Sequence, residues 1–341
     1  MGGVRTVTVL GAAGFLGSAL ARALSRQDIR LRLVARRPVA LPADAIADVS
    51  THLIDVTDAG ALSAVLEGSD VIVYLLKLSG DWRRATTYLH GEAVNVDPMR
   101  TIVKTFAGRD ETPLCIYAGT TGQVGTPPAH PMDGTEPDDP KSDYDRQKHD
   151  AERVLLAGHD EGAVRGISLR LSTVFGPRPG GGIDFGVVGT LIRQAVEGNE
   201  LTVWGDGSVT RDLVHVDDCV RAFLLAAAHP DKLAGRHWLV GSGSVWTLRR
   251  LFRQVVESVA HHTGKPAVPV VSVPPPAHAV PSDMRGVRVN PAPLRAACGW
   301  SARVPAEVGI DRTVAALVEQ GDPYAESGCA PLPAPGVHPS V

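Results

Sequence analysis

The sequence "VRTVTVLGAAGFLGSALARAL" (residues 4–24) decides the fold. Residues 4–10 form an apolar run that is typical of a buried strand. Leucines then recur at every fourth position from Leu16 to Leu24, which is the spacing of one face of an α-helix. A glycine-rich turn joins the two patterns. We therefore predict a strand, a tight turn and a helix at the start of the chain.

Short apolar runs and helix-length amphipathic stretches continue to alternate through the first half of the chain. The further runs that we interpret as strands are 29–35, 51–56, 71–76, 113–119 and 166–173. Parallel strands that are joined by helices form a sheet covered on both faces. The alternation therefore predicts an α/β fold with a doubly wound parallel sheet of the Rossmann type.

Beyond about residue 175 the pattern becomes irregular, because "FGPRPGGGIDFG" (175–186) is broken by glycine and proline. Two closing helices are predicted near 291–299 and 306–319. We interpret the second half as a smaller C-terminal lobe rather than an independent domain. The expected boundaries are 1–174 for the Rossmann domain, with a later contribution from about 211–245, then 175–210 and 246–320 for the lobe, and 321–341 for a disordered tail.

The composition is that of an ordinary globular protein, with 341 residues, 44% hydrophobic residues and 21% charged residues. The net charge of −3 gives no basic surplus that would favour nucleic acid or an anionic membrane as a partner. No apolar run is long enough to span a bilayer, and the N-terminus lacks the pattern of a secretory signal. The four cysteines (Cys115, Cys219, Cys298, Cys329) lie far apart, which predicts neither disulfides nor a metal site and favours the cytoplasm.

The glycine-rich turn is a candidate phosphate-binding loop. Gly11, Gly14 and Gly17 lie between the first strand and the first helix, where a backbone without side chains can approach a pyrophosphate. The spacing GxxGxxG differs from the usual GxGxxG, and glycine triplets occur by chance. The strand–turn–helix context favours a dinucleotide, with Phe15 and Leu16 as further contacts.

The end of the second strand indicates which dinucleotide is preferred. A site for NAD places an acidic residue there to bind the ribose 2′-hydroxyl, whereas this chain has Arg36 and Arg37. Guanidinium groups suit a 2′-phosphate, so we predict NADP(H); the alternative is two solvated arginines. Asp55 is placed to meet the adenine amino group, or is a turn residue. Val56 and Leu75 complete the candidate cofactor contacts.

The stretch "YDRQKHDAE" (144–152) places Tyr144 and Lys148 four residues apart in a predicted helix. Positions four apart share one face, so the phenol and the ammonium group point the same way. By themselves they could form an ordinary surface pair. A functional interpretation needs support from the rest of the chain.

With the glycine turn, Tyr144 and Lys148 in this order, the chain resembles the extended short-chain dehydrogenase/reductase family, which includes the NAD-dependent epimerases and dehydratases. Asn95 in "GEAVNVD" and three later blocks also match: "RLSTVFGPRP" (170–179), "LTVWGDGSVTRDLVHVDD" (201–218) and "LRAACGW" (294–300). The sequence is most similar to 4-ketoreductases that act on dTDP-4-keto-6-deoxyhexoses in deoxysugar biosynthesis.

The resemblance implies a catalytic set of Thr120, Tyr144 and Lys148. In the family, the lysine lowers the pKa of the tyrosine and binds the nicotinamide ribose, and the threonine hydroxyl binds the same substrate oxygen as the phenol. Family members commonly form homodimers through helices that here would lie near 92–107 and 144–157.

The residues beside Thr120 bear on the reaction. Dehydratases of the family carry Asp and Glu at the positions of Thr121 and Gly122, so we predict that dehydration is absent and that Thr121 contacts substrate. Arg211 matches the family arginine that clamps a nucleotide diphosphate, although its block could simply fold the lobe. Arg285 and Arg288 are candidates for a second clamp.

Three hypotheses follow. The first is an NADPH-dependent 4-ketoreductase for a nucleotide-linked deoxysugar. The second is a nucleotide-sugar epimerase, whose cofactor stays bound and is not consumed. The third is a non-catalytic NADP-sensing protein, against which the retained Tyr144 and Lys148 count.

Overall fold

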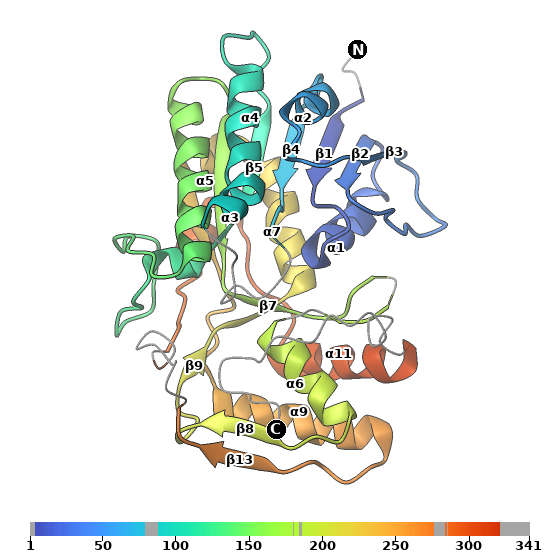
Figure 1. Cartoon of the computed structure of the whole chain (residues 1–341), viewed down its shortest axis with the longest axis vertical. Coiled ribbons are helices and arrows are strands. Elements are labelled where there is room, and N and C mark those ends of the chain that lie inside the picture. Colours follow the sequence, from blue (N-terminus) through green and yellow to red (C-terminus); the bar gives the residue numbers. More distant parts are fainter. Residues whose placement is uncertain are drawn as a thin grey trace.

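The chain is built around a seven-stranded parallel sheet with the strand order β11-β6-β5-β4-β1-β2-β3 (Figure 1). The computed structural model describes residues 4–78, 88–179, 181–183, 186–275, 284 and 286–320. The strands are β1 (Thr6–Leu10), β2 (Arg30–Ala35), β3 (Asp48–Leu53), β4 (Val71–Tyr74), β5 (Leu114–Thr120), β6 (Arg165–Leu171) and β11 (Arg236–Val240). The order from β3 to β6 is that of doubly wound dinucleotide-binding folds, which confirms the predicted fold class.

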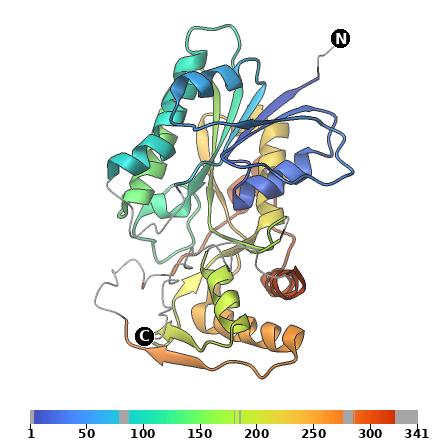
Figure 2. The same ribbon diagram turned by 45° about the vertical axis from the view of Figure 1, so that its right-hand side comes forward.

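Helices cover both faces of the sheet (Figure 2). One face carries α1 (Phe15–Leu24) and α7 (Val216–Ala228), and the other carries α2 (Ala59–Leu66), α4 (Asp97–Phe106) and α5 (Asp143–Asp160). Each face has its own apolar core, and the central strands β1, β4 and β5 contribute to both because nearly all their residues are buried. A short helix, α3 (Tyr88–Asn95), precedes α4.

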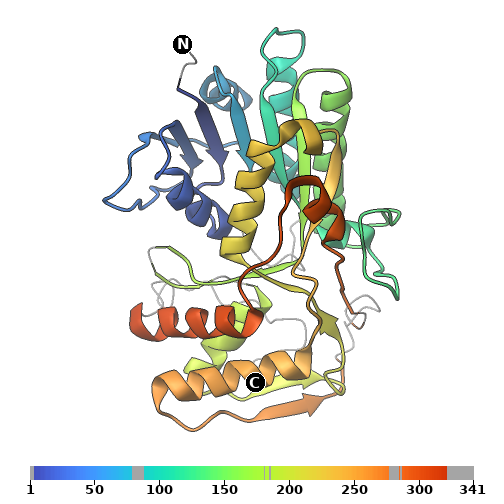
Figure 3. The same ribbon diagram turned by 180° about the vertical axis from the view of Figure 1, so that it is seen from behind.

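A second group of elements lies beyond the carboxyl ends of the central strands (Figure 3). It buries a separate apolar core that includes Leu191, Phe252 and Ile310. Its main members are α6 (Val187–Val196), α9 (Leu248–Thr263), α11 (Ala306–Gln320) and the parallel strands β8 (Leu201–Trp204) and β13 (Val270–Val273). The connecting elements are η1 (Thr121–Val124), β7 (Thr173–Phe175), β9 (Thr210–Arg211), β10 (Leu213–His215), α8 (Pro230–Leu233), β12 (Trp246–Thr247) and α10 (Ala292–Cys298).

The third strand lies three residues earlier than its sequence pattern predicts. The apolar residues Ile54 and Val56 suggested a strand over 51–56, but they follow β3 and pack against the core from a loop. β3 itself is an edge strand whose residues are mostly exposed or half-buried. A solvated edge needs few apolar residues, so the hydrophobic pattern did not locate it.

The glycine turn brings α1 unusually close to β1. Gly11 has a positive φ of 83°, and a Cβ atom there would lie 2.9 Å from the carbonyl oxygen of Leu75. At Gly17, inside α1, a Cβ atom would lie only 2.1 Å from the carbonyl oxygen of Gly11. Both contacts are with backbone, which cannot move aside as a side chain can. The backbone therefore needs glycine at both positions for α1 to start this close to β1.

Replacing Gly17 with alanine should force α1 away from the turn. We expect the free energy of unfolding of Gly17→Ala to fall by about 1–3 kcal/mol, the usual cost of overpacking, as measured by urea denaturation. Gly60→Ala is the matched control, because a Cβ atom there meets nothing closer than 3.4 Å and Gly60 also lies in a helix. Equal stability of the two variants would contradict this account of the turn.

Candidate active site

A buried lysine marks the candidate site, at the carboxyl ends of the central strands. Lys148 on α5 is only 3% exposed, and its Nζ donates hydrogen bonds to the carbonyl oxygens of Leu76 (3.1 Å) and Ala118 (3.0 Å). These carbonyls belong to the segment after β4 and to β5. An ammonium group has three donor hydrogens, so one remains for another acceptor beyond these two.

Burial and the nearby ammonium of Lys77 lower the pKa of Lys148 from its ordinary 10.5 to about 7. The ammonium form costs free energy here because water is excluded and a like charge is close. Lys77 follows β4 and is exposed. Sequence analysis did not single it out, because one lysine after a strand is no signal on its own.

The Tyr144 ring lies near both of these amino groups. The Nζ atoms of Lys77 and Lys148 are 5.5 Å and 6.0 Å from the ring centroid. Burial, reinforced by the Asp145 carboxylate, nevertheless raises the pKa of Tyr144 well above its ordinary value of 10. The expected lowering relies on Lys148 together with the positive nicotinamide ring of the oxidised cofactor, so it stays a prediction. The folded chain by itself keeps the phenol protonated at neutral pH.

Thr120 lies at the end of β5, where its side chain caps the short helix η1. The Oγ1 atom accepts a hydrogen bond from the backbone N–H of Gly122 (3.1 Å), and the backbone N–H of Thr120 donates to the Gln123 side chain (3.0 Å). This capping box fixes the hydroxyl but uses it only as an acceptor. Its hydrogen can still be donated to a substrate oxygen. Thr121, the next residue, is half-buried in η1.

A carboxylate that sequence analysis missed lies next to Gly122. A Cβ atom at Gly122 would be 2.3 Å from Oδ1 of Asp145, so this side chain occupies the space that a residue 122 side chain would fill. Asp145 Oδ2 accepts a hydrogen bond from the Ser142 hydroxyl (2.6 Å), and burial raises the pKa of Asp145. The spacing of Ser142 and Asp145 is that of a helix start, which could have indicated the contact between them.

Three buried polar connections hold α5 against the sheet. The Tyr117 hydroxyl donates to the backbone carbonyl of Lys148 (2.9 Å). Asn95 Nδ2 donates to the Gln147 side chain (2.7 Å), so the asparagine that matches the family pattern ties α3 to α5. One turn after Lys148, Glu152 accepts from the buried Arg170 of β6, which also binds Asp138 through two bonds of 2.6 Å and 2.7 Å. Each polar group in this buried set has a partner, as burial requires.

The turn between β1 and α1 fits a dinucleotide phosphate. Gly14 is the N-cap of α1, is exposed, and provides no side-chain hydrogen bond to the helix, whose first turn carries no acidic residue. The first N–H groups of such a helix attract an anion. Phe15 and Leu16, the first two helical residues, are half-buried at the same place.

The other predicted cofactor residues gather around this turn. Arg36 and Arg37 are exposed after β2, and Arg37 donates to the Ala13 carbonyl (3.3 Å). Asp55 accepts two hydrogen bonds from Thr57, which hold its pKa below the ordinary value with a smaller contribution from Arg36. Asp55 therefore acts as a turn residue in the structure. The half-buried Val56 and Leu75 follow β3 and β4.

Two of the three predicted substrate arginines lie on neighbouring segments. Arg211 is half-buried in β9, and Val287 donates to the carbonyl of Thr210 (3.0 Å), so the segment that carries Arg288 runs beside β9. The guanidinium of Arg288 donates to the Ala129 carbonyl. Arg285 lies outside the described residues.

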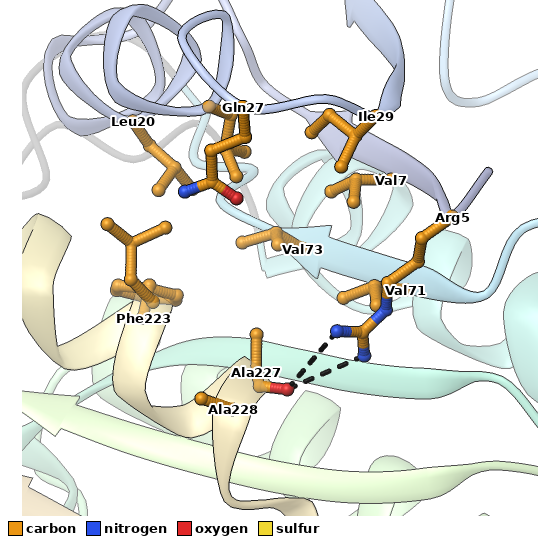
Figure 4. Close-up of a pocket in the computed structure, with 12 residues that line it drawn as sticks. Arg5, Val7, Leu20, Gln27, Ile29, Val71, Val73, Phe223, Ala227 and Ala228 are labelled. Carbon is orange, nitrogen blue, oxygen red and sulfur yellow. Dashed lines mark hydrogen bonds between the residues drawn. The ribbon is translucent and has the colours of Figure 1, made fainter. Parts of the chain in front are cut away.

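A cavity of about 250 Å³ lies at the opposite end of the sheet (Figure 4). It is lined mainly by apolar side chains of β1, β4, α1 and α7, and Arg5 crosses it to reach the Ala227 carbonyl. Doubly wound sheets bind ligands at the carboxyl ends of their strands, whereas this cavity lies at the amino ends. We therefore do not assign it to the candidate site.

Two classes of feature are absent from the part of the chain that the structure describes. Its helices include none with the length and hydropathy to cross a bilayer. Its histidine, cysteine, aspartate and glutamate side chains form no group of three or more that could hold a metal ion.

The lowered pKa of Lys148 predicts a pH-dependent stability difference. Between about pH 7 and 10.5 the unfolded chain holds the lysine proton and the folded chain does not, so Lys148 makes the free energy of unfolding rise with pH in this window. Relative to Lys148→Met, the wild type should therefore gain stability from pH 7 to 10 in urea denaturation. Lys104→Met is the control for a lost surface charge, because Lys104 is an exposed residue of α4. If the difference in the free energy of unfolding between wild type and Lys148→Met stays constant from pH 7 to 10, the pKa of Lys148 is not lowered.

The chain has relatives among known proteins. The chain is 30% identical to a UDP-glucose 4-epimerase from Mycolicibacterium smegmatis over 200 residues, which is 58% of this chain and 60% of that enzyme. It is 28% identical to a dTDP-4-dehydro-6-deoxy-D-allose reductase from Streptomyces bikiniensis over 234 residues, covering 64% of this chain and 72% of the reductase.

Solved structures share the whole fold. The structure of MoeE5 in complex with UDP-glucuronic acid and NAD superposes with a TM-score of 0.75 at 26% identity and covers 91% of this chain and 97% of that one. A UDP-glucose 4-epimerase from Thermotoga maritima gives a TM-score of 0.77 at 22% identity, covering 92% and 99% of the two chains. Residues 7–241 match the NAD dependent epimerase/dehydratase family. The chain belongs to this family, as its glycine turn and its Tyr144–Lys148 pair predicted.

Proposed function

We propose that the protein is an NADPH-dependent 4-ketoreductase that reduces the C4 ketone of a nucleotide-linked, dTDP-type 4-keto-6-deoxyhexose. The observation that carries this proposal is the buried Tyr144 phenol near Lys148, on the helix α5 that packs against β5, the strand that ends at Thr120. A ketone that accepts hydride becomes an alkoxide, which must then be given a proton. A phenol that keeps its proton at neutral pH is prepared for that task.

The chain's own residues divide the chemistry among them. The Thr120 hydroxyl donates a hydrogen bond to the ketone oxygen, and Tyr144 transfers its proton to that oxygen as negative charge develops. The third N–H of Lys148 holds the cofactor's ribose, while Leu76 and Ala118 fix the ammonium in place. The bound NADPH supplies the hydride. After the transfer, the Lys77 and Lys148 side chains stabilise the phenolate until water reprotonates it.

The same site argues against two alternative reactions. An epimerase usually keeps a tightly bound NAD, whereas Arg36 and Arg37, exposed after β2, favour an exchangeable NADP(H). A dehydratase needs a pair of carboxyl groups, and Asp145, tied to Ser142, is a single one beside Gly122. The epimerase remains the second candidate, because curated relatives include 4-epimerases.

The two apolar cores support most of the proposed division of the chain, although Leu294 and Trp300 pack in the first core. Residues 1–174, with about 211–245, would bind NADPH, and 175–210 with 246–320 would bind the sugar nucleotide. In this proposal Arg211 and Arg288, on adjacent segments, hold the diphosphate, for which guanidinium groups are well suited.

The reaction itself can be tested with purified protein. Incubation with NADPH and a dTDP- or UDP-linked 4-keto-6-deoxyhexose should consume NADPH stoichiometrically and give a product about two mass units heavier in mass spectrometry. Tyr144→Phe keeps the ring but lacks the proton donor, so turnover should fall by at least about a hundredfold while NADPH binding is unchanged.

Two results would overturn the proposal. A product of unchanged mass without NADPH consumption would identify an epimerase. Turnover of a free ketone but of no sugar nucleotide would remove the role of the diphosphate.

The cofactor preference has its own test. If Arg36 and Arg37 bind the 2′-phosphate, replacing both with alanine should weaken NADPH binding by roughly 1–3 kcal/mol and leave NADH binding nearly unchanged in fluorescence titrations. Arg22→Ala, an exposed arginine further along α1, controls for the loss of surface charge. Equal affinity of the wild type for NADH and NADPH would refute the preference.

A further inference from the structure

A third arginine reaches the cofactor turn from the second half of the chain. Arg178 follows β7, in a segment that passes beneath α1 (Figures 1 and 3). Its guanidinium donates to the carbonyl oxygen of Ala13, in the glycine turn. The two residues are 165 positions apart in the sequence, and none of the motifs that predict the site includes their contact.

Arg178 lies on one arm of a hairpin. The Arg178 N–H donates to the Gly182 carbonyl (3.0 Å), and Pro177 pairs with Ile183 in an antiparallel bridge. Ile183 is fully buried in the second core, and its carbonyl accepts a hydrogen bond of 2.9 Å from the buried Arg193. The hairpin is thereby anchored to the core of the second lobe, so the position of Arg178 relative to Ala13 depends on how that lobe sits on the glycine turn.

Arg178 and Arg37 converge on the same oxygen atom. Arg37 donates to the same Ala13 carbonyl, so two guanidinium groups lie close together near Gly14 at the start of α1. Two guanidinium groups that share one acceptor atom repel each other. A phosphate group bound by both arginines attracts each of them and so offsets this repulsion.

We propose that Arg178 binds the 2′-phosphate of NADP(H) together with Arg37, so that the second lobe contributes directly to cofactor selection. This assignment rests on the NADPH preference proposed above. We choose the 2′-phosphate over the pyrophosphate because Arg178 meets Arg37, which follows β2, where the adenosine ribose is read in doubly wound folds. Binding of the phosphate would also tie the lobe to the glycine turn before any sugar arrives.

Binding measurements without a sugar substrate test the assignment. Arg178→Ala should weaken binding of NADPH and of 2′,5′-ADP about tenfold or more, and should leave NADH and 5′-ADP nearly unchanged in isothermal titration. The first of these ADP compounds, 2′,5′-ADP (adenosine 2′,5′-bisphosphate), carries the 2′-phosphate without a pyrophosphate. The second, 5′-ADP, carries only the pyrophosphate. Arg178→Lys keeps the charge but loses the planar fork, so an intermediate loss is expected.

A matched control separates this effect from general damage. Arg249→Ala removes a guanidinium that likewise donates to a backbone carbonyl, that of Asp206 (2.8 Å), in the second lobe. It should bind all four nucleotides as the wild type does, and thermal melts should show all variants folded. An equal loss for NADPH and NADH in Arg178→Ala would assign Arg178 to the pyrophosphate instead, and no loss for either would exclude a phosphate role.

The two proposals fail in different ways. A wild type that binds NADH and NADPH equally refutes the NADPH preference and this inference together. A wild type that prefers NADPH, with an Arg178→Ala variant that keeps the same preference, refutes only the inference.

Discussion

The position of Tyr144 in the candidate site depends on one buried side chain, that of Lys148. Two backbone carbonyls, from the segment after β4 and from β5, hold it at the ends of the strands. Parallel strands end in carbonyls that no neighbouring strand uses, so a cation fits there in place of water. Because Lys148 is on α5, this contact also fixes the rotation of the helix, and with it the direction in which Tyr144 points.

The other contacts of α5 define the orientation of the helix more than they stabilise the fold. Its buried links run to the sheet through Tyr117 and the Glu152–Arg170 pair, and to α3 through Gln147. A buried ion pair adds little net stability compared with apolar packing, but it favours one alignment of its partners. These links therefore orient α5 and the candidate catalytic residues that it carries.

The sequence predicted those features whose signals lie close together along the chain. The glycine turn and the pair of Tyr144 and Lys148 are short spacings that carry a physical meaning by themselves, and both are found where they were expected. The contact of Asp145 with Gly122 and that of Arg178 with Ala13 join segments that only the folded sheet brings together. Strand β3 was misplaced because an exposed edge leaves a weak hydrophobic pattern.

The contact between Gly122 and Asp145 has a consequence for substitutions. A dehydratase of this family carries glutamate where this chain has Gly122, but any side chain there would collide with the Asp145 carboxylate. A side chain at position 122 would therefore have to displace the Asp145 carboxylate, which would break its hydrogen bond with the Ser142 hydroxyl at the start of α5. The two positions are thus coupled, because the effect of a substitution at residue 122 depends on the side chain at residue 145.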